Sequence, residues 1–200
     1  MKKIIIPQEF SGKVYMTSDL HYDHFNICNY CARPFVSKTE MNEVLTNNWN
    51  SIVTDEDIVF ILGDFCFGGR RAWKKHLKNL KGKKYLIIGN HDKDSEIYYE
   101  GFESVDDIVK LSLYDEEIEG YVTLILCHYC LTTWPDQQKG ACHCFGHSHT
   151  NPRRTTQLDN DLIAKRPLPS YDVGVDNNNF MPVSYETLKI IFTQQLLYGK

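Results

Sequence analysis

Residues 57–62 read DIVFIL, and a glycine and an aspartate follow them directly. A continuous apolar run of this length that ends at glycine is typical of a β-strand buried on both faces. Residues 85–88 (YLII) form a second run of this kind, which is also closed by a glycine. The intervening residues 70–80 form a basic segment with apolar side chains at helical spacing, namely Trp73, Leu77 and Leu80. We therefore predict two buried strands joined by an amphipathic helix.

The residues before this unit predict one more strand and one more helix. Residues 13–17 (KVYMT) are strand-like, and Ser37 with Glu40 forms a capping-box pattern at the start of a helix. The order strand, helix, strand, helix, strand is typical of a layered α/β domain, so the first sheet is predicted to be largely parallel.

The second half of the chain predicts a different arrangement. Residues 104–113 and 121–127 are strand-like and are joined by an acidic turn, which favours an antiparallel pair. Further predicted elements are strands at 141–145 and 171–175, a loop at 151–170 and a last helix capped by Ser184. The simplest interpretation is a single α/β domain over residues 1–200, with two sheets and flanking helices.

Composition limits the possible classes of protein. Hydrophobic residues make up 42% and charged residues 24% of the 200 residues, as in a globular protein. The formal net charge of −4 argues against a grip on long nucleic acid, but it leaves room for a small phosphorylated substrate. No apolar run is long enough for a signal peptide or a membrane span. We therefore expect a cytoplasmic protein with no membrane partner, whose seven cysteines are reduced.

Metal-ligand side chains concentrate in five short segments, each of which directly follows a strand-like run. The segments contain Asp19-Leu20-His21, Gly63-Asp64, Gly89-Asn90-His91-Asp92, His128 and Gly146-His147-Ser148-His149. Ligand sites of open α/β sheets lie beyond the carboxyl ends of the strands, so the five segments can meet in space. Carboxylate and imidazole together favour divalent ions such as Mn, Fe and Zn. Two ions about 3.5–4 Å apart need a ligand that touches both, and Asp64 is the candidate bridge.

The five segments, in this order, resemble the motif series of the calcineurin-like metallophosphoesterase family. Residues 172–176 (DVGVD) and 182–184 (PVS) resemble its short bacterial and phage members. The resemblance implies a four-layer α/β/β/α sandwich, in which two mixed sheets are flanked by helices. It also implies two divalent ions (Mn, Fe, Zn or Ni), one held by Asp19, His21 and His149 and the other by Asn90, His128 and His147, with Asp64 bridging. A hydroxide between the ions would attack a small phosphomonoester or phosphodiester, such as a nucleotide or cyclic nucleotide.

Four further residues are candidates for catalysis or substrate contact. The resemblance implies that His91 faces the substrate and stabilises the transition state or protonates the leaving oxygen, which suits histidine at neutral pH. Asp92 is a catalytic candidate that would orient His91, or else it caps the segment beyond. Arg33 could clamp a phosphate with its forked donors, or else it is a solvated surface arginine. His24, in the same loop, is a weaker candidate for substrate contact.

Other functions remain open at this point. Phe67 stands where the protein Ser/Thr phosphatases of this superfamily carry a second aspartate, which argues against protein phosphatase activity. Cleavage of short or single-stranded nucleic acid is an alternative to hydrolysis of a small substrate. A metal-binding interaction protein without activity is a third possibility. Arg153 and Arg154 follow the last metal segment closely enough to reach the site, although a solvated loop is the favoured interpretation.

The cysteines permit one alternative metal site. Cys28 and Cys31, and likewise Cys127 and Cys130, are spaced like halves of a structural zinc module, and Cys142 and Cys144 lie nearby in the sequence. Cysteines within strand-like runs are more simply interpreted as small buried hydrophobes.

Overall fold

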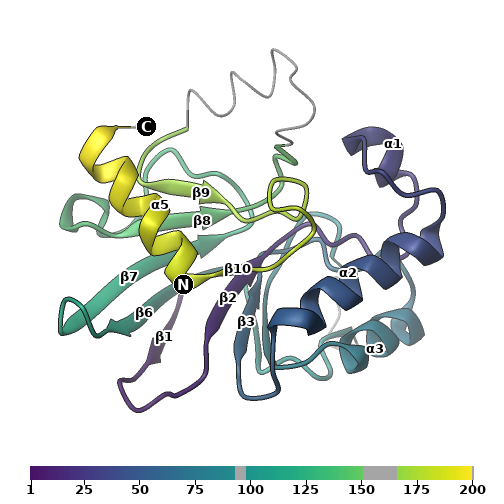
Figure 1. The fold of residues 1–200 in the computed structure, drawn as a ribbon, viewed down its shortest axis with the longest axis horizontal. Helices are drawn as coiled ribbons and strands as arrows, with labels where there is room; N and C mark the ends of the chain where they lie inside the picture. The colour runs from purple at the N-terminus through teal and green to yellow at the C-terminus, as the bar shows by residue number, and fades with distance from the viewer. Residues whose placement is uncertain (93–97, 151–165, 200) are drawn as a thin grey trace.

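Two five-stranded β-sheets pack against each other and carry helices on their outer sides (Figure 1). The computed structural model describes residues 1–92, 98–150 and 166–199. The architecture confirms the predicted α/β sandwich of two mixed sheets flanked by helices.

The first sheet has the strand order β10-β2-β3-β4-β5 and is parallel except at β10. Its strands are β10 (Val183–Ser184), β2 (Val14–Thr17), β3 (Ile58–Ile61), β4 (Lys83–Ile87) and β5 (Ser104–Asp106). The DIVFIL stretch forms β3, a central strand whose four residues are all buried. A strand covered on both faces needs apolar side chains on both, which explains the continuous apolar run.

The second sheet has the strand order β1-β6-β7-β8-β9. Its strands are β1 (Lys2–Ile6), β6 (Ile108–Asp115), β7 (Gly120–Cys127), β8 (Cys142–Phe145) and β9 (Ser170–Asp172). β6 and β7 form the predicted antiparallel pair, and the other neighbours are parallel. β6 buries every second residue, the pattern of a strand with one face on the core.

Helices α2 (Lys38–Ile52) and α3 (Arg70–Asn79) lie on the side of the first sheet, and α5 (Tyr185–Tyr198) lies at the other side of the sandwich (Figure 1). Both predicted caps are confirmed, because Ser37 accepts the Glu40 N–H at 3.1 Å and Ser184 accepts the Thr187 N–H at 3.2 Å. The sequence patterns do not predict the short helix α1 (Ile27–Cys31) or the 3-10 turn at Gln137–Lys139.

Two apolar clusters hold the layers together. One lies between the sheets and includes Met16, Phe60 and Leu124, which have no exposed surface. The other packs α2 and α3 against the first sheet around Trp49 and Trp73. Burial of each such side chain contributes about 1.5–3 kcal/mol.

Three elements differ from the prediction. Residues 104–113 form two strands in different sheets, because the chain crosses from the first sheet to the second between β5 and β6. β1 is an edge strand paired with β6, and the sequence patterns do not predict it. β9 ends at Asp172, because the Asp172 carboxylate accepts the Gly174 N–H at 2.8 Å and starts a turn. Most of the predicted loop at 151–170 lies outside the described residues.

Among the described residues, no helix combines the length and the apolar character that crossing a membrane requires.

Candidate metal centre

The carboxyl ends of five strands meet along one edge of the sandwich. The first sheet contributes the loops after β2, β3 and β4, and the second sheet contributes the loops after β7 and β8. Backbone hydrogen bonds join these loops: the His21 N–H donates to Asp64 O at 2.9 Å, and the Gly146 N–H donates to His128 O at 2.9 Å. Segments that are far apart in the sequence are therefore neighbours at this edge.

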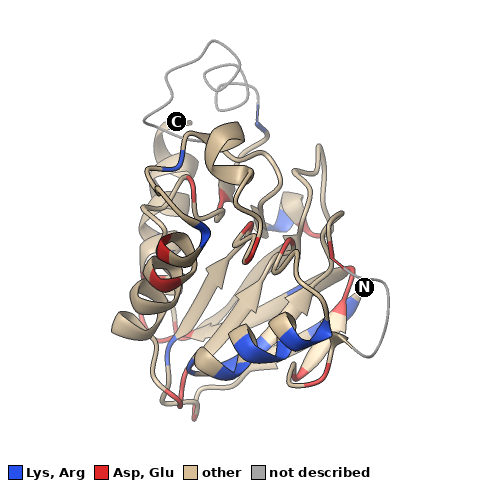
Figure 2. Ribbon diagram, turned by 90° about the vertical axis from the view of Figure 1, so that its right-hand side faces the viewer, with Lys and Arg blue, Asp and Glu red and all other residues tan. Residues whose placement is uncertain are grey.

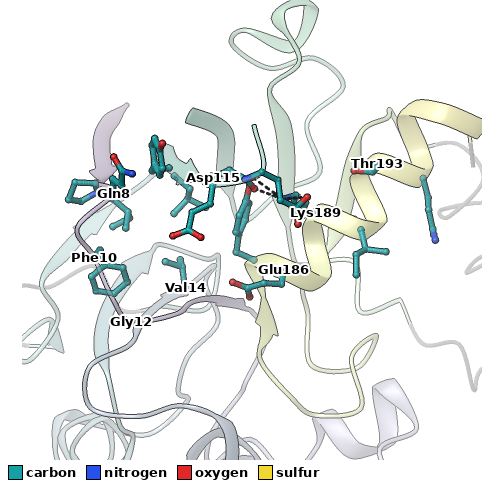
Figure 3. A pocket seen from close by; sticks show the side chains of 17 residues that line it. Gln8, Phe10, Gly12, Val14, Asp115, Glu186, Lys189 and Thr193 are labelled. Atoms are coloured by element: carbon teal, nitrogen blue, oxygen red, sulfur yellow. Dashed lines mark hydrogen bonds and ion pairs between the residues drawn. The ribbon is translucent and has the colours of Figure 1, made fainter. Parts of the chain in front are cut away.

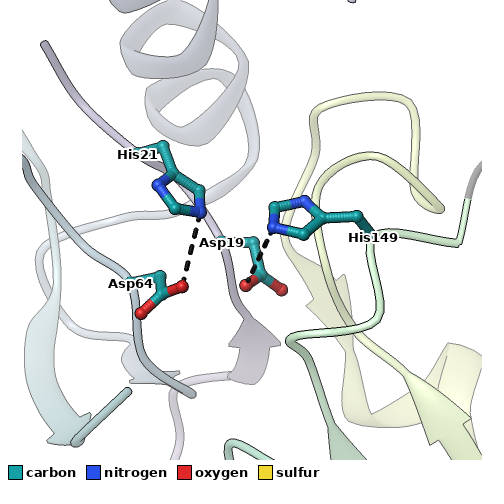
Figure 4. A group of neighbouring side chains, drawn as sticks. All are labelled: Asp19, His21, Asp64 and His149. Atoms are coloured by element: carbon teal, nitrogen blue, oxygen red, sulfur yellow. Dashed lines mark ion pairs between the residues drawn. The ribbon is translucent and has the colours of Figure 1, made fainter. Parts of the chain in front are cut away.

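Four of the seven predicted ligands place side-chain ligand atoms within 4.8 Å of one another, namely Asp19, His21, Asp64 and His149 (Figure 4). His21 Nε2 lies 3.4 Å from Asp64 Oδ2, and His149 Nε2 lies 3.8 Å from Asp19 Oδ1. Asp19, His21 and Asp64 are at most 2% exposed. Two carboxylates and two imidazoles at this spacing are a suitable donor set for a divalent cation.

Asp64 connects this cluster to the other three predicted ligands. The Oδ2 atom that faces His21 also lies 3.7 Å from His128 Nε2. His128 Nε2 in turn lies 2.9 Å from Asn90 Oδ1, and the His147 ring packs against the His128 ring with a centroid distance of 5.1 Å. The carboxylate of Asp64 is thus shared by two groups of candidate ligands.

Two of the histidines are oriented through their second ring nitrogen. His128 Nδ1 lies 2.7 Å from Leu62 O, and His149 Nδ1 lies 2.7 Å from Asp176 Oδ2. In each ring the Nε2 atom is left to face the carboxylates of the site. Metal-binding histidines are typically held in this way, because the second hydrogen bond fixes the tautomer and the ring orientation.

The backbone at the site is strained. Positive φ angles between 47° and 64° occur at five of the seven candidate ligands: Asp19, His21, Asp64, His147 and His149. Residues other than glycine rarely adopt this region, and such strain costs about 1–3 kcal/mol for each residue. Strain of this kind persists only where surrounding contacts fix it, as when the His147 N–H donates to Asp19 Oδ2 at 2.9 Å. Its concentration at one edge is typical of a functional site.

Glycines allow the loops to approach the carboxylates closely. A Cβ atom on Gly89 would lie 2.4 Å from Asp64 Oδ1, and one on Gly146 would lie 2.5 Å from Asp19 Oδ2. Any side chain at these two positions would collide with a candidate ligand.

An unbalanced charge is costly at this buried site. Two features of the residues suit a metal ion, the Asp19 carboxylate and the Nε2 atom of His21. Burial raises the pKa of Asp19 to about 7, although His149 and His128 act in the opposite direction, so a bound cation would favour the ionised carboxylate. Burial lowers the pKa of His21, so its ring is neutral. Among the described residues, the buried Nε2 atom of His21 has no hydrogen-bond partner. A divalent cation held here would stabilise the carboxylate and would give His21 Nε2 a partner.

His91 and His24 lie beside the cluster. The His91 N–H donates to Asp64 Oδ1 at 2.9 Å, and its exposed ring lies 5.6 Å from the ring of His21. The His24 ring stacks on Phe67 at 3.8 Å, and its Nδ1 atom lies 3.4 Å from His21 Nδ1. Both rings border the His21 side of the site, so both remain candidates for substrate contact.

Arg33 has a different place from the one predicted. Its side chain has no exposed surface and forms a bidentate ion pair with Asp176, at 2.8 and 2.9 Å. The same guanidinium donates to Asp19 O at 2.7 Å and to Leu20 O at 3.1 Å. Because these donors are already engaged inside the protein, the structure contradicts the predicted phosphate clamp. Arg33 instead ties the Asp19–His21 loop to Asp176.

Asp92 also differs from the prediction that it orients His91. Its carboxylate accepts the N–H groups of Asp64 and Phe65, both at 2.9 Å, and that of Gly89 at 2.8 Å. The side chain therefore holds the loop after β3 against the loop after β4, a role that neither alternative predicted. Arg153 and Arg154 lie outside the described residues.

Asp176 is a candidate functional residue that the motif analysis does not identify. Its carboxylate joins Arg33 to His149, and its side chain is completely buried. The DVGVD stretch contains the only signal for it. A partner that lies 143 positions away, as Arg33 does, cannot be inferred from that stretch.

Asp176→Asn is expected to weaken metal binding by about 10–100-fold, because the carboxylate that orients His149 is lost. Titration calorimetry of the metal-free protein with Mn²⁺ measures this effect. The matched control is Asp115→Asn, which removes another buried carboxylate paired with Lys189 at 2.8 Å. Both variants should melt at lower temperature, since breaking a buried ion pair costs about 3–5 kcal/mol. Equal metal affinity in the two variants would contradict the orienting role of Asp176.

The cysteines do not form the alternative zinc module. All seven are free, and six of them are buried. Among the described residues, each group of side chains able to hold a metal contains at most one cysteine. Cys28 and Cys31 belong to one apolar cluster and Cys142 and Cys144 to the other, as expected for small hydrophobes.

A cavity of about 630 Å³ lies away from the ligand cluster, beside the start of α5 (Figure 3). Its lining includes Phe10, Asp115 and Lys189, and none of the predicted site residues. It therefore contributes nothing to the metal centre.

Two mixed sheets whose shared edge gathers aspartates, histidines and an asparagine define a metallophosphoesterase-type protein. The chain belongs to the calcineurin-like phosphoesterase family, whose sequence profile matches residues 12–174. Membership supports metal-dependent hydrolysis of phosphoesters in general.

Sequence similarity to known proteins extends over most of the chain. An uncharacterized protein of Methanocaldococcus jannaschii is 32% identical, over 88% of this chain and 89% of its own length. The gene 66 protein of Mycobacterium phage D29 is 28% identical, over 74% of this chain and 84% of its own. A crystal structure of a protein of unknown function from Aquifex aeolicus superposes with a TM-score of 0.65 and 23% identity, covering 90% of this chain and all of that one, and it shows the same fold.

Proposed function

We propose that the protein hydrolyses a small phosphomonoester or phosphodiester, such as a nucleotide or cyclic nucleotide, with the help of two divalent metal ions. The observation that carries the proposal is the position of Asp64. One oxygen of this buried carboxylate lies 3.4 Å from His21 Nε2 and 3.7 Å from His128 Nε2. A carboxylate between two groups of ligands is suited to bridging two ions.

The chain offers a ligand set for each ion. Asp19, His21 and His149 would hold one ion, Asn90, His128 and His147 the other, and Asp64 both. When bound, such an ion pair supplies an activated water nucleophile and neutralises the charge that develops on the phosphoryl oxygens. The mixture of imidazole and carboxylate donors favours Mn, Fe, Zn or Ni over Mg or Ca.

His91 would act directly on the substrate. Its backbone is fixed to Asp64, while its ring is exposed beside the ligand cluster. A proton held on this ring could pass to the leaving oxygen as the bond to phosphorus breaks. His24, which borders the same side of the site, would contact the substrate without taking part in proton transfer.

A substrate panel tests this proposal. The metal-free protein is loaded with Mn, Fe, Zn or Ni and assayed with bis(p-nitrophenyl) phosphate, p-nitrophenyl phosphate, nucleotides, cyclic nucleotides and oligonucleotides. We expect turnover of at least one small ester with at least one metal, and loss of turnover on chelation without change in the circular dichroism spectrum. Inactivity with every metal would contradict the proposal and favour a metal-binding protein without activity.

A further inference from the structure

The positive charge of the chain is concentrated in one segment. Residues 70–84 (RRAWKKHLKNLKGKK) contain eight of the 22 lysines and arginines and no aspartate or glutamate. The net charge of −4 therefore conceals a strongly basic segment in an otherwise acidic protein. Overall charge gives a poor estimate of attraction for a polyanion when the charges are separated in this way.

Helix α3 presents this charge on one face. Its apolar side chains and His76 are buried, whereas Arg71, Lys75 and Lys78 are exposed. Figure 2 shows the basic residues along the outer side of the helix. Helical spacing places residues 71, 75 and 78 in a row, and the seven helical steps from Arg71 to Lys78 give this row a length of about 10 Å.

Part of the charge is balanced by one carboxylate. Glu100 pairs with Arg70 at 3.3 Å and with Lys74 at 2.8 Å, and all three side chains are more than half exposed. Arg71, Lys75 and Lys78 form no ion pair with a carboxylate of the described residues. We call these three cations the basic row of α3.

Helix α3, which carries the basic row, begins close to the metal centre. Arg70 follows Phe67 by three residues, so their Cα atoms are at most about 11 Å apart. The Phe67 ring lies 5.0 Å from the ring of His91 and is 37% exposed. From inside the helix, His76 Nε2 lies 3.0 Å from Asp23 Oδ2, two residues beyond His21. Helix α3 is therefore held, through His76, against the loop that carries candidate metal ligands.

We infer that the basic row of α3 binds the phosphate backbone of single-stranded nucleic acid and leads it to the metal centre. The inference rests on the proposed phosphoesterase function and names a substrate class for it. A linear row of cations matches a linear series of phosphates, and exposed rings such as Phe67 can stack on unpaired bases. An anionic membrane fits less well, because a membrane-surface helix exposes an apolar face, whereas α3 buries Trp73 and Leu77 in the core.

Binding is measured apart from catalysis. Fluorescence anisotropy follows a labelled oligothymidylate of about 16 nucleotides, in chelator, at about 50 to 200 mM salt. The test variant combines Arg71→Gln, Lys75→Gln and Lys78→Gln. The control combines Lys2→Gln, Lys3→Gln and Lys13→Gln, three exposed lysines outside α3 that carry the same total charge. Circular dichroism verifies that both variants are folded.

We expect the test variant to lose affinity by at least about tenfold and to flatten the salt dependence by about two units of log–log slope, since each single-strand phosphate contact contributes about 0.7. The control should stay within about twofold of wild type, and hydrolysis of bis(p-nitrophenyl) phosphate should be unchanged in both variants. Absence of oligonucleotide binding, equal losses in the two variants, or α3-dependent binding to phosphatidylserine vesicles in place of the oligonucleotide would each overturn the inference.

The two proposals fail in different ways. Wild-type protein that hydrolyses small esters but does not bind the oligonucleotide through α3 refutes the basic row and leaves the phosphoesterase intact. Protein that binds the oligonucleotide through α3 but hydrolyses no ester with any metal supports the surface and refutes the proposed activity.

Discussion

Asp64→Asn is expected to lower kcat/KM for a small phosphoester by at least about 10³-fold, because a bridged metal pair contributes several kcal/mol of transition-state stabilisation. The substitution keeps the size of the side chain and removes the charge that two cations would share. Its neutral amide is a poor bridge, so we also expect fewer than two ions per chain. Metal analysis by inductively coupled plasma mass spectrometry and steady-state kinetics measure the two effects.

The control for this substitution is again Asp115→Asn. Asp115 is buried like Asp64, but it pairs with Tyr185 and Lys189 and lies opposite Gly120 at the start of β7, whereas His128 follows the end of β7. This variant should keep both its metal content and its rate. If Asp64→Asn retained two ions and normal turnover, Asp64 would not be the bridge.

His91→Ala is expected to lower kcat by about 10²-fold for a nucleoside ester, because a positioned general acid is removed from the site. Metal content should stay unchanged, since the side chain of His91 is not a candidate ligand and its N–H bond to Asp64 belongs to the backbone. Stopped assays of nucleoside release, together with metal analysis, provide the measurement.

The leaving group supplies a control within the same variant. A p-nitrophenolate departs without protonation, so the loss of rate with a p-nitrophenyl ester should be much smaller than with a nucleoside ester. Equal losses with both esters would indicate that His91 stabilises charge instead of donating a proton. An unchanged rate with both would refute any catalytic role.

Much of the fold can be predicted from the sequence because its elements are locally encoded. The apolar run of β3 and the capping serines of α2 and α5 carry their own signals. β1 and the division of residues 104–113 between two sheets could not be predicted in this way. Both depend on which strands pair within each sheet. That pairing is set by tertiary contacts, which local sequence patterns do not reveal.

The convergence of the site could be predicted, whereas the tasks of individual polar residues could not. The five segments follow the carboxyl ends of strands that lie at the same end of the sandwich, so they meet in space. Figure 4 shows four of their side chains together. Arg33 and Asp92 have residue types that suit phosphate binding and catalysis, yet both are engaged in bracing the loops. Burial and distant partners decide between such roles, and Arg33 finds its partner 143 residues away.

The strained backbone of the candidate ligands is supported by hydrogen bonds from neighbouring polar side chains. Positive φ angles at five candidate ligands require outside support. Asp92 supplies three hydrogen bonds to the loops after β3 and β4, and Arg33 with Asp176 supports the loops after β2 and β8. These contacts within the protein hold the ligand loops in place, as expected of a preorganised site.

Anomalous diffraction from crystals soaked in manganese shows whether Asp64 bridges two ions. We expect two peaks about 3.5–4 Å apart with the Asp64 carboxylate between them, and with Asp19, His21 and His149 around one of the two. Peaks that lie away from Asp64, or a single ion that leaves His128 and Asn90 without contact, would contradict it.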